Sequence, residues 1–298
     1  MRETAKTKMD STDLSVSIIV PAFNEEESIV EVIDRIKKAW SNCDLPYEII
    51  VVDDGSTDKT FELAASQNVR VLQHTSNRGY GASLKTGIKE SKYDWILITD
   101  GDGTYPLEQM SSFLEFVPEY DMVVGARIGK NTNIPFVRRP AKWFLRVLAS
   151  FIAGTKIPDL NSGLRIFRKD LSLEFSYLYP NGFSYTSTIT MAFLTHGYNV
   201  KYIPIDYHKR KGKSSIRAYD FVGFNRLLVK LTLFFKPIKL FSAISGFLFL
   251  LALFVLFFSK FYLGQVMDIT TIVIMLSALQ IFLFGLLAEL IVRLKEKK

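Results

Sequence analysis

The stretch Trp95-Ile96-Leu97-Ile98-Thr99-Asp100-Gly101-Asp102-Gly103-Thr104 decides how the rest of the chain is interpreted. It begins with four apolar residues, and after Thr99 it carries two carboxylates separated by one glycine. A short apolar run is typical of a buried parallel strand, and open α/β sheets bind ligands beyond the carboxyl ends of their strands. Mg²⁺ or Mn²⁺ offsets the repulsion between two aspartates, because it binds carboxylate and phosphate oxygens together. The stretch predicts a metal site for a diphosphate, with a ligand-free Asp-Gly turn as the alternative.

Other apolar runs alternate with segments of helical periodicity. Besides the opening stretch, strands are expected at residues 16–21, 47–52, 69–72 and 121–126. Asn24 and Glu27 have the spacing of a capping box for the first helix. Four alternations of strand and helix predict an α/β fold, in which a mostly parallel sheet carries helices on both faces. The carboxyl edge of this sheet would gather two acidic pairs, Asp53 with Asp54 and Asp100 with Asp102.

The composition favours an anionic partner other than nucleic acid. The 298 residues carry a formal net charge of +7, which suits phosphorylated substrates or anionic lipid heads. The sequence contains no zinc-finger spacing and no RNA-binding aromatic motif. Cys43 is the single cysteine, so a disulfide within the chain is excluded, which fits a reducing compartment.

The last quarter of the chain is much more apolar than the rest and predicts a membrane hairpin of two spans. The expected parts are a disordered tail at 1–14, a globular α/β domain at 15–218, an interfacial amphipathic helix at 219–236 and a membrane part at 237–298, with spans at about 238–259 and 270–292. The alternative for the third part is a core helix of the globular domain.

The charges around the hairpin predict its orientation and partners. Basic residues precede the first span and close the chain, so both termini and the globular domain are expected in the cytoplasm. The polar N-terminus lacks the apolar core of a signal peptide, which agrees with this orientation. Gln280 and Glu289 lie within the second span and could pair with another helix or with a second copy of the chain, giving a homo-oligomer.

Several short motifs follow one another in a fixed order. They are SIIVPAFNE at 17–25, VDDGSTD at 52–58, NRG at 77–79, DGD at 100–102, GAR at 125–127, DLNSGLR at 159–165 and HKRKGKS at 208–214. Together they resemble family 2 glycosyltransferases, whose GT-A fold is a Rossmann-like α/β fold. The last two motifs are similar to those of the branch that acts on dolichyl and polyprenyl phosphates. The resemblance covers about residues 15–235.

The resemblance implies a donor site for a nucleoside-diphosphate sugar. The donor-binding residues would be Pro21, Ala22, Glu25, Asp53 and Asp54, with Arg210 and Lys213 closing over the diphosphate from a basic hairpin or lid. Asp100 and Asp102 would hold Mg²⁺ or Mn²⁺, which neutralises charge on the departing diphosphate. The branch often carries Asp-Ala-Asp-Leu-Gln at this point. Thr104 takes the place of the glutamine here, and its hydroxyl would be a weaker third metal ligand.

Arginines after the acidic motifs predict a site for an acceptor phosphate, because a guanidinium binds phosphate with a planar fork. The resemblance implies that Arg127 and one of Arg138 or Arg139 hold this phosphate, and the expected acceptor-phosphate residues are Arg127, Arg138, Arg139, Ser162 and Arg165. Arg127 is expected to act in catalysis with Asp100 and Asp102. Alternatively, Arg138, Arg139 and Lys142 belong to a solvated face or touch anionic lipid heads.

The absence of a carboxylate base predicts that the acceptor is a phosphate and not a hydroxyl. Relatives that glycosylate hydroxyls often place a carboxylate as base, but residues 181–188 contain none. A phosphate needs no base, since it is already anionic at neutral pH. The expected activity is inverting transfer of a sugar, from a donor of the GDP-mannose or UDP-glucose type, to a polyprenyl or dolichyl phosphate in the membrane. The alternatives are transfer to a hydroxyl of a lipid-linked or surface glycan and a non-catalytic membrane scaffold.

Overall fold

A computed structural model describes residues 14–41, 43–117, 119–128, 139–208, 233–262, 264 and 268–295, without the side chains of 139–142, 144 and 145. The chain divides into two compact units, residues 1–218 and 219–298.

The first unit contains a seven-stranded sheet in the order β3-β2-β1-β4-β6-β5-β7. Its strands are β1 (Val16–Ala22), β2 (Tyr47–Asp53), β3 (Arg70–Gln73), β4 (Trp95–Ile98), β5 (Met122–Ala126), β6 (Arg165–Arg168) and β7 (Val200–Pro204). Its helices are α1 (Ile29–Trp40), α2 (Thr60–Ala65), α3 (Tyr80–Glu90), α4 (Arg139–Ala153), α5 (Lys169–Glu174) and α6 (Tyr185–Thr195), with the 3₁₀ segments η2 (Leu107–Phe116) and η4 (Ser176–Leu178).

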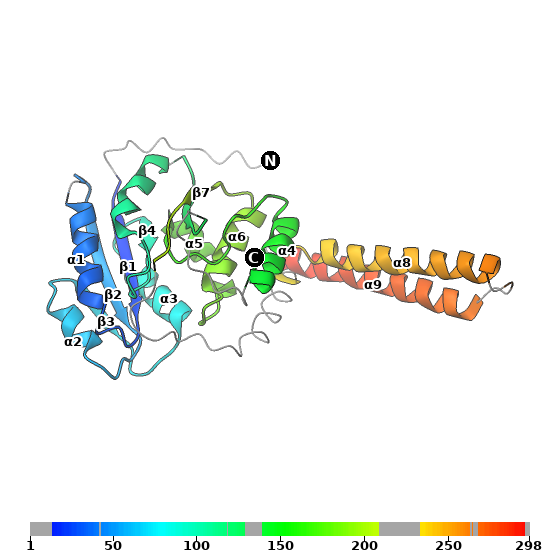
Figure 1. The fold of residues 1–298 in the computed structure, drawn as a ribbon, viewed down its shortest axis with the longest axis horizontal. Helices are drawn as coiled ribbons and strands as arrows, with labels where there is room; N and C mark the ends of the chain where they lie inside the picture. Colours follow the sequence, from blue (N-terminus) through cyan, green and yellow to red (C-terminus); the bar gives the residue numbers. More distant parts are fainter. Residues whose placement is uncertain are drawn as a thin grey trace. The chain divides into compact units, whose positions relative to one another are not determined.

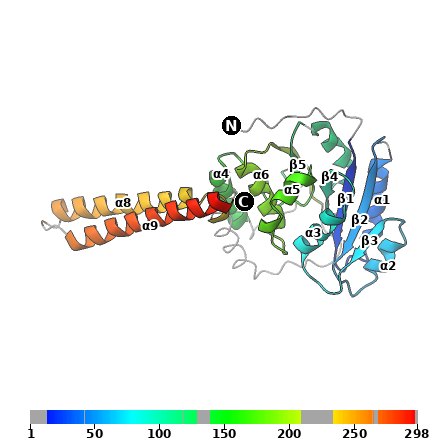
Figure 2. The same ribbon diagram turned by 180° about the vertical axis from the view of Figure 1, so that it is seen from behind.

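The predicted mostly parallel α/β sheet is confirmed. Strands β3, β2, β1 and β4 are parallel neighbours, and β1 and β4 are buried along their whole length. Helix α1 lies on one face of the sheet together with η2, and α3 lies on the opposite face (Figures 1 and 2). The apolar side of α1 is formed by Ile29, Val32, Ile33, Ile36 and Trp40, all buried in the core.

Strand β6 departs from the predicted simple alternation, because it lies antiparallel between β4 and β5. Ile98 at the end of β4 is paired with Arg165 at the beginning of β6. An antiparallel strand starts where its neighbour ends, so the loop before β6 arrives beside Asp100. Strand β5 ends at the same edge, since Val124 is paired with Arg165. One inserted strand thus brings the ends of β4 and β5 and the start of β6 to a single edge of the sheet.

The first helix starts later than its sequence pattern predicts. Helix α1 begins after Ser28, which makes no side-chain capping bond. Asn24 instead has a φ of 55° and accepts a 2.9 Å hydrogen bond from the amide of Thr57. The predicted capping box is therefore wrong, because a tertiary contact between the loops after β1 and β2 uses the asparagine.

The second unit contains two long apolar helices, α8 (Pro237–Tyr262) and α9 (Asp268–Lys295), each long and apolar enough to cross a membrane. They bracket the two predicted spans. The expected interfacial helix at 219–236 lies mostly outside the described residues, and residues 233–235 are helical.

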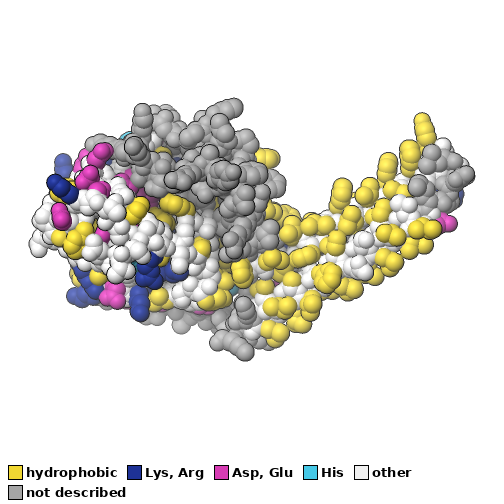
Figure 3. All heavy atoms as spheres, turned by 90° about the horizontal axis from the view of Figure 1, so that it is seen from below, with side chains coloured by type: hydrophobic (Ala, Val, Ile, Leu, Met, Phe, Trp, Pro, Cys, Tyr) yellow, Lys and Arg dark blue, Asp and Glu magenta, His cyan; other side chains and the backbone are white. Residues whose placement is uncertain are grey.

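Small residues at intervals of seven form the interface between α8 and α9. These positions are Ser245, Ala252 and Ser259 in α8, and Thr271, Ala278 and Gly285 in α9. The Ser245 hydroxyl donates a 2.8 Å hydrogen bond to the Ala278 carbonyl across the interface. Phe247, Phe254 and Phe261 are exposed, and hydrophobic side chains cover the visible surface of the hairpin (Figure 3). Close packing through small residues with large apolar side chains outside is the arrangement expected in lipid.

Candidate active site

The predicted acidic edge is present at the carboxyl ends of β1, β2 and β4. Ala22 is paired with Asp53, so the loops after β1 and β2 start side by side. The amide of Thr99 donates to the carbonyl of Ile19, which places the Asp100–Asp102 turn against the end of β1. The Ser28 hydroxyl donates a 2.8 Å hydrogen bond to the Gly101 carbonyl, tying this turn to the start of α1.

Asp100 lies between a tyrosine and a glycine. The phenol of Tyr80 donates a 2.9 Å hydrogen bond to Asp100 Oδ1. A Cβ on Gly163 would lie 2.6 Å from the same oxygen, so this position accepts only glycine while the carboxylate stays where it is. Burial and the nearby charge of Asp100 raise the pKa of Tyr80, which keeps the phenol protonated as a donor.

Asp102 is buried and is oriented by the residue predicted to be a metal ligand. Its Oδ1 accepts hydrogen bonds from the Thr104 amide at 3.1 Å and the Thr104 hydroxyl at 2.7 Å. Thr104 is 1% exposed. The Thr104 hydroxyl thus donates its hydrogen bond to the Asp102 carboxylate, and in this structure Thr104 orients Asp102.

The donor set at this turn fits a metal that is shared with substrate. Among the described residues no group of three or more His, Cys, Asp and Glu side chains is placed to hold an ion alone. Mg²⁺ typically takes one or two protein carboxylates and completes its shell with water and substrate phosphates. Asp100 and Asp102, one residue apart on one turn, supply such a pair.

Asp53 and Asp54 are both buried and use their oxygens within the protein. Asp53 accepts from the amide and hydroxyl of Ser56 and, at 3.0 Å, from the side chain of Gln73. Asp54 is 2.7 Å from His74 Nδ1 and accepts from the amides of residues 78 and 79 at 2.9 and 2.7 Å. These carboxylates hold the loops around the edge, and direct contact with a donor stays a prediction.

The other predicted donor residues line the end of β1. Pro21 and Ala22 are buried, and Glu25 is half-buried. The amide of Glu25 donates a 2.8 Å hydrogen bond to the hydroxyl of Thr60, which ties the loop after β1 to the start of α2. Arg210 and Lys213 lie outside the described residues.

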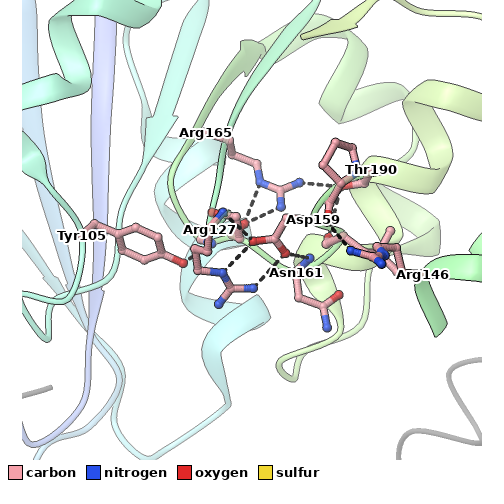
Figure 4. A network of polar contacts seen from close by, with 11 residues as sticks. Tyr105, Arg127, Arg146, Asp159, Asn161, Arg165 and Thr190 are labelled. Atoms are coloured by element: carbon pink, nitrogen blue, oxygen red, sulfur yellow. Dashed lines mark hydrogen bonds and ion pairs between the residues drawn. The ribbon is translucent and has the colours of Figure 1, made fainter. Parts of the chain in front are cut away.

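Arg127 directly follows β5, is nearly buried and forms an ion pair with Asp159. Its Nε and Nη2 donate to the two oxygens of Asp159 at 2.7 and 2.9 Å, and its amide donates to Oδ2 at 3.0 Å (Figure 4). Burial alone would raise the pKa of Asp159, but the Arg127 charge and the hydrogen bonds from Arg127 and the Asn161 amide together outweigh burial and lower that pKa to about 2. The Tyr207 ring lies 5.2 Å from the guanidinium. The sequence pattern did not indicate this pairing, although Asp159 opens one of the quoted motifs.

Arg165 is fully buried and does not fit the predicted contact with an acceptor phosphate. Its guanidinium donates to the Ser162 carbonyl, to the Thr186 carbonyl at 3.0 Å and to the Thr190 hydroxyl at 2.8 Å (Figure 4). Burial lowers the pKa of Arg165. Ser162 is also fully buried. Both residues brace the loop before β6 against α6, which explains an arginine at the first position of a central strand.

The remaining predicted acceptor residues cannot be placed. Arg138 lies outside the described residues, and Arg139 begins α4 with a side chain outside them. The structure adds Tyr105 to the site, since its buried phenol accepts a 2.6 Å hydrogen bond from the Gly163 amide. Tyr80 thus contacts Asp100, and Tyr105 contacts Gly163, the glycine beside Asp100 in space. No pattern in the sequence indicated either tyrosine.

Comparison with protein families matches two parts of the chain. Residues 17–175 match the model described as glycosyl transferase family 2. Residues 236–294 match the GtrB C-terminal hairpin. The first match contains the sheet edge, and the second contains α8 and most of α9.

Comparison with individual proteins gives similar relatives. The chain is 31% identical to a dolichyl-phosphate hexose transferase of Haloferax volcanii, over 68% of this chain and 87% of that protein. It is 27% identical to a dodecaprenyl-phosphate galacturonate synthase of Rhizobium johnstonii, over 94% of this chain and 88% of that protein. A crystal structure of glucosyl-3-phosphoglycerate synthase from Mycobacterium tuberculosis, with Mn²⁺, UDP and phosphoglyceric acid, superposes with a TM-score of 0.58. It is 18% identical and covers 73% of this chain and 77% of that one, a likeness that shows the GT-A fold.

Proposed function

The chain belongs to glycosyl transferase family 2, and we propose that it transfers a sugar from a nucleoside diphosphate to a polyprenyl or dolichyl phosphate. One observation carries the proposal: the Asp100–Asp102 pair at the sheet edge and an apolar two-helix hairpin occur in the same chain. The first suits a metal-bound diphosphate, and the second keeps the enzyme where a lipid acceptor is concentrated. Relatives that match both parts act on isoprenoid phosphates according to their names.

On the donor side, the residues at the sheet edge would bind and orient the nucleoside diphosphate. Asp100 and Asp102 would hold Mg²⁺ or Mn²⁺, which when bound supplies positive charge to the departing diphosphate. Thr104 fixes the direction of the Asp102 carboxylate. Pro21, Ala22 and the neighbouring loop would take the base.

On the acceptor side, Arg127 is the described cation best suited to a phosphate. Asp159 fixes its guanidinium through two hydrogen bonds, so the cation is oriented before an acceptor arrives. A phosphate oxygen of the acceptor attacks the anomeric carbon while the bond from that carbon to the donor diphosphate breaks. A single displacement of this kind inverts the anomeric configuration and needs no protein base. Residues 181–188 indeed supply no carboxylate.

The hairpin would place the reaction at the cytoplasmic face of a membrane. Basic residues precede α8 and follow the apolar part of α9, which is the distribution expected when both ends stay in the cytoplasm. Helix α4 also exposes Trp143, Val147 and Phe151, four residues apart and each about half exposed. This spacing forms one apolar stripe, which suits contact with the lipid interface.

A donor panel tests the proposed function. The full chain in detergent or liposomes is incubated with GDP-mannose or UDP-sugars, polyprenyl phosphate and Mg²⁺ or Mn²⁺, and the lipid product is identified by mass spectrometry. We expect one donor to yield a lipid-phosphate sugar, with the configuration inverted. Asp100→Asn and Asp102→Asn should abolish this product, whereas Asp170→Asn, an exposed aspartate in α5, should not.

The same panel separates the alternatives. Product only with a glycosylated acceptor would mean transfer to a hydroxyl. Donor binding without turnover for any acceptor would mean a scaffold with the enzyme fold.

A further inference from the structure

We propose that Tyr80 is a positioning residue of the catalytic edge, whose phenol fixes the Asp100 carboxylate in the orientation that receives the metal. The inference rests on the proposed function, because it assigns Asp100 to the metal. Its basis is the 2.9 Å hydrogen bond from the Tyr80 hydroxyl to Asp100 Oδ1. Tyr80 lies 20 residues before Asp100, and Thr104 likewise donates a hydrogen bond to Asp102, the other carboxylate of the pair.

The backbone around Tyr80 is held independently of the metal site. Gly79 has a φ of 100°, a conformation that favours glycine, and it directly precedes α3. Asp54 accepts hydrogen bonds from the amides of Arg78 and Gly79. His74 binds Asp54 through Nδ1 and lies 2.9 Å from the Thr86 hydroxyl through Nε2. These hydrogen bonds fix the turn that directly precedes Tyr80.

The ring of Tyr80 is also fixed from its other side. It stacks on Phe183, with ring centroids 5.7 Å apart and an interplanar angle of 18°. The carbonyl of Asn181 accepts a 3.1 Å hydrogen bond from the amide of Ala82, and Lys85 Nζ donates to the Asn181 side chain. The loop before α6 thus holds the first turn of α3, and a rotation of the Tyr80 side chain would break its stacking on Phe183 and its hydrogen bond to Asp100.

The carboxylate that receives this hydrogen bond has little room for another orientation. Gly163 approaches Asp100 so closely that a Cβ would lie 2.6 Å from Oδ1 and 2.9 Å from Oδ2. Its amide in turn donates to the buried phenol of Tyr105. Asp100 is therefore confined between the Tyr80 hydroxyl and the backbone of Gly163. Groups that orient metal ligands in this way typically change metal affinity by about 10–100-fold when they are removed.

The test uses Tyr80→Phe, which keeps the ring and its stacking on Phe183 and removes only the hydroxyl. Mn²⁺ binding to the full chain is measured by electron paramagnetic resonance, with UDP and with GDP in separate titrations. We expect Tyr80→Phe to weaken Mn²⁺ binding by about 10–100-fold and to raise the Mn²⁺ concentration needed for half-maximal transfer. The KM for polyprenyl phosphate and the melting temperature should stay near those of the wild type.

A matched control removes the same kind of hydrogen bond elsewhere. Tyr198 donates a 3.1 Å hydrogen bond to Glu174 Oε2 on the exposed surface, so Tyr198→Phe should leave Mn²⁺ binding unchanged. Gly163→Ala displaces the Asp100 carboxylate from the other side and should weaken Mn²⁺ binding as well.

The outcomes separate this inference from the function on which it rests. Equal Mn²⁺ affinity in Tyr80→Phe and the wild type, with binding intact in both, overturns the role of Tyr80 alone. Absence of Mn²⁺ binding in the wild type, with either nucleotide, overturns both the metal site and the inference. A parallel loss of melting temperature and Mn²⁺ affinity in Tyr80→Phe means a merely structural role and also overturns the proposal.

Discussion

The buried pair of Arg127 and Asp159 offers the sharpest test of how the site is built. Replacing Asp159 with asparagine removes the negative charge and leaves the Arg127 guanidinium buried beside a neutral amide. The side chains are only 11% and 12% exposed, so solvent cannot compensate. Breaking a buried pair by removing one partner costs about 3–5 kcal/mol. We expect Asp159→Asn to destabilise the catalytic unit by this amount.

The pKa of Asp159 gives a second, smaller value for the contribution of the ion pair to the free energy of unfolding. It falls from 3.8 to about 2 on folding, and one pKa unit corresponds to about 1.4 kcal/mol. The ionised carboxylate therefore contributes about 2 kcal/mol at neutral pH. Because the folded-state pKa is lowered, this stabilisation is fully present above about pH 4 and is lost as the pH falls toward about 2. Both values predict that loss of the Asp159 charge destabilises the catalytic unit. The value from breaking the pair is larger because it includes the cost of leaving the Arg127 guanidinium buried and unpaired.

Thermal unfolding of the full chain in detergent measures the effect. For a unit of this size, 3–5 kcal/mol corresponds to a decrease in melting temperature of roughly 6–20 °C. Asp170→Asn is the matched control, since its ion pair with Arg168 is exposed and should contribute less than about 1 kcal/mol. A melting temperature for Asp159→Asn equal to that of Asp170→Asn would refute the reasoning.

A double variant separates stability from function. Replacing Arg127 with methionine and Asp159 with leucine removes both charges, and apolar replacement of a buried pair is often neutral or stabilising. We expect the melting temperature to recover to near that of the wild type while sugar transfer is lost, because the acceptor phosphate has lost its cation. Recovery of transfer would contradict the proposed role of Arg127.

Three further predictions address the metal, the loop before α6 and the hairpin. Chelation with EDTA should abolish transfer, and added Mg²⁺ or Mn²⁺ should restore it without any change in secondary structure by circular dichroism; activity that persists in EDTA would exclude metal dependence. Gly81→Ala should destabilise the catalytic unit by about 1–3 kcal/mol, measured by thermal unfolding, because the new Cβ would collide with the carbonyl of Pro180. Gly285→Leu should weaken the α8–α9 contact, because even a Cβ there would lie 2.5 Å from the Cβ of Phe241. Faster proteolysis of the hairpin in detergent would show this loss. Resistance equal to that of the wild type would contradict the close packing.

The sequence alone determined the class of the fold and the position of the acidic edge. Apolar runs such as residues 95–98 are typical of buried strands when helical segments alternate with them, and aspartates that follow such runs are expected at the carboxyl edge. The two spans were likewise visible, because a bilayer requires about 20 consecutive apolar residues. These conclusions depend on local composition and periodicity, which a single sequence displays.

Only the tertiary structure decided which polar groups face one another. Arg165 looks like a phosphate ligand in the sequence, yet β6 carries it into the core, where backbone carbonyls accept its hydrogen bonds. Arg127 meets Asp159 and Tyr80 meets Asp100 across separations of 32 and 20 residues. The first pairing depends on the antiparallel neighbours β5 and β6, and the second on the approach of α3 to the turn after β4. Strand insertion and packing are properties of the whole chain, so no local pattern records them.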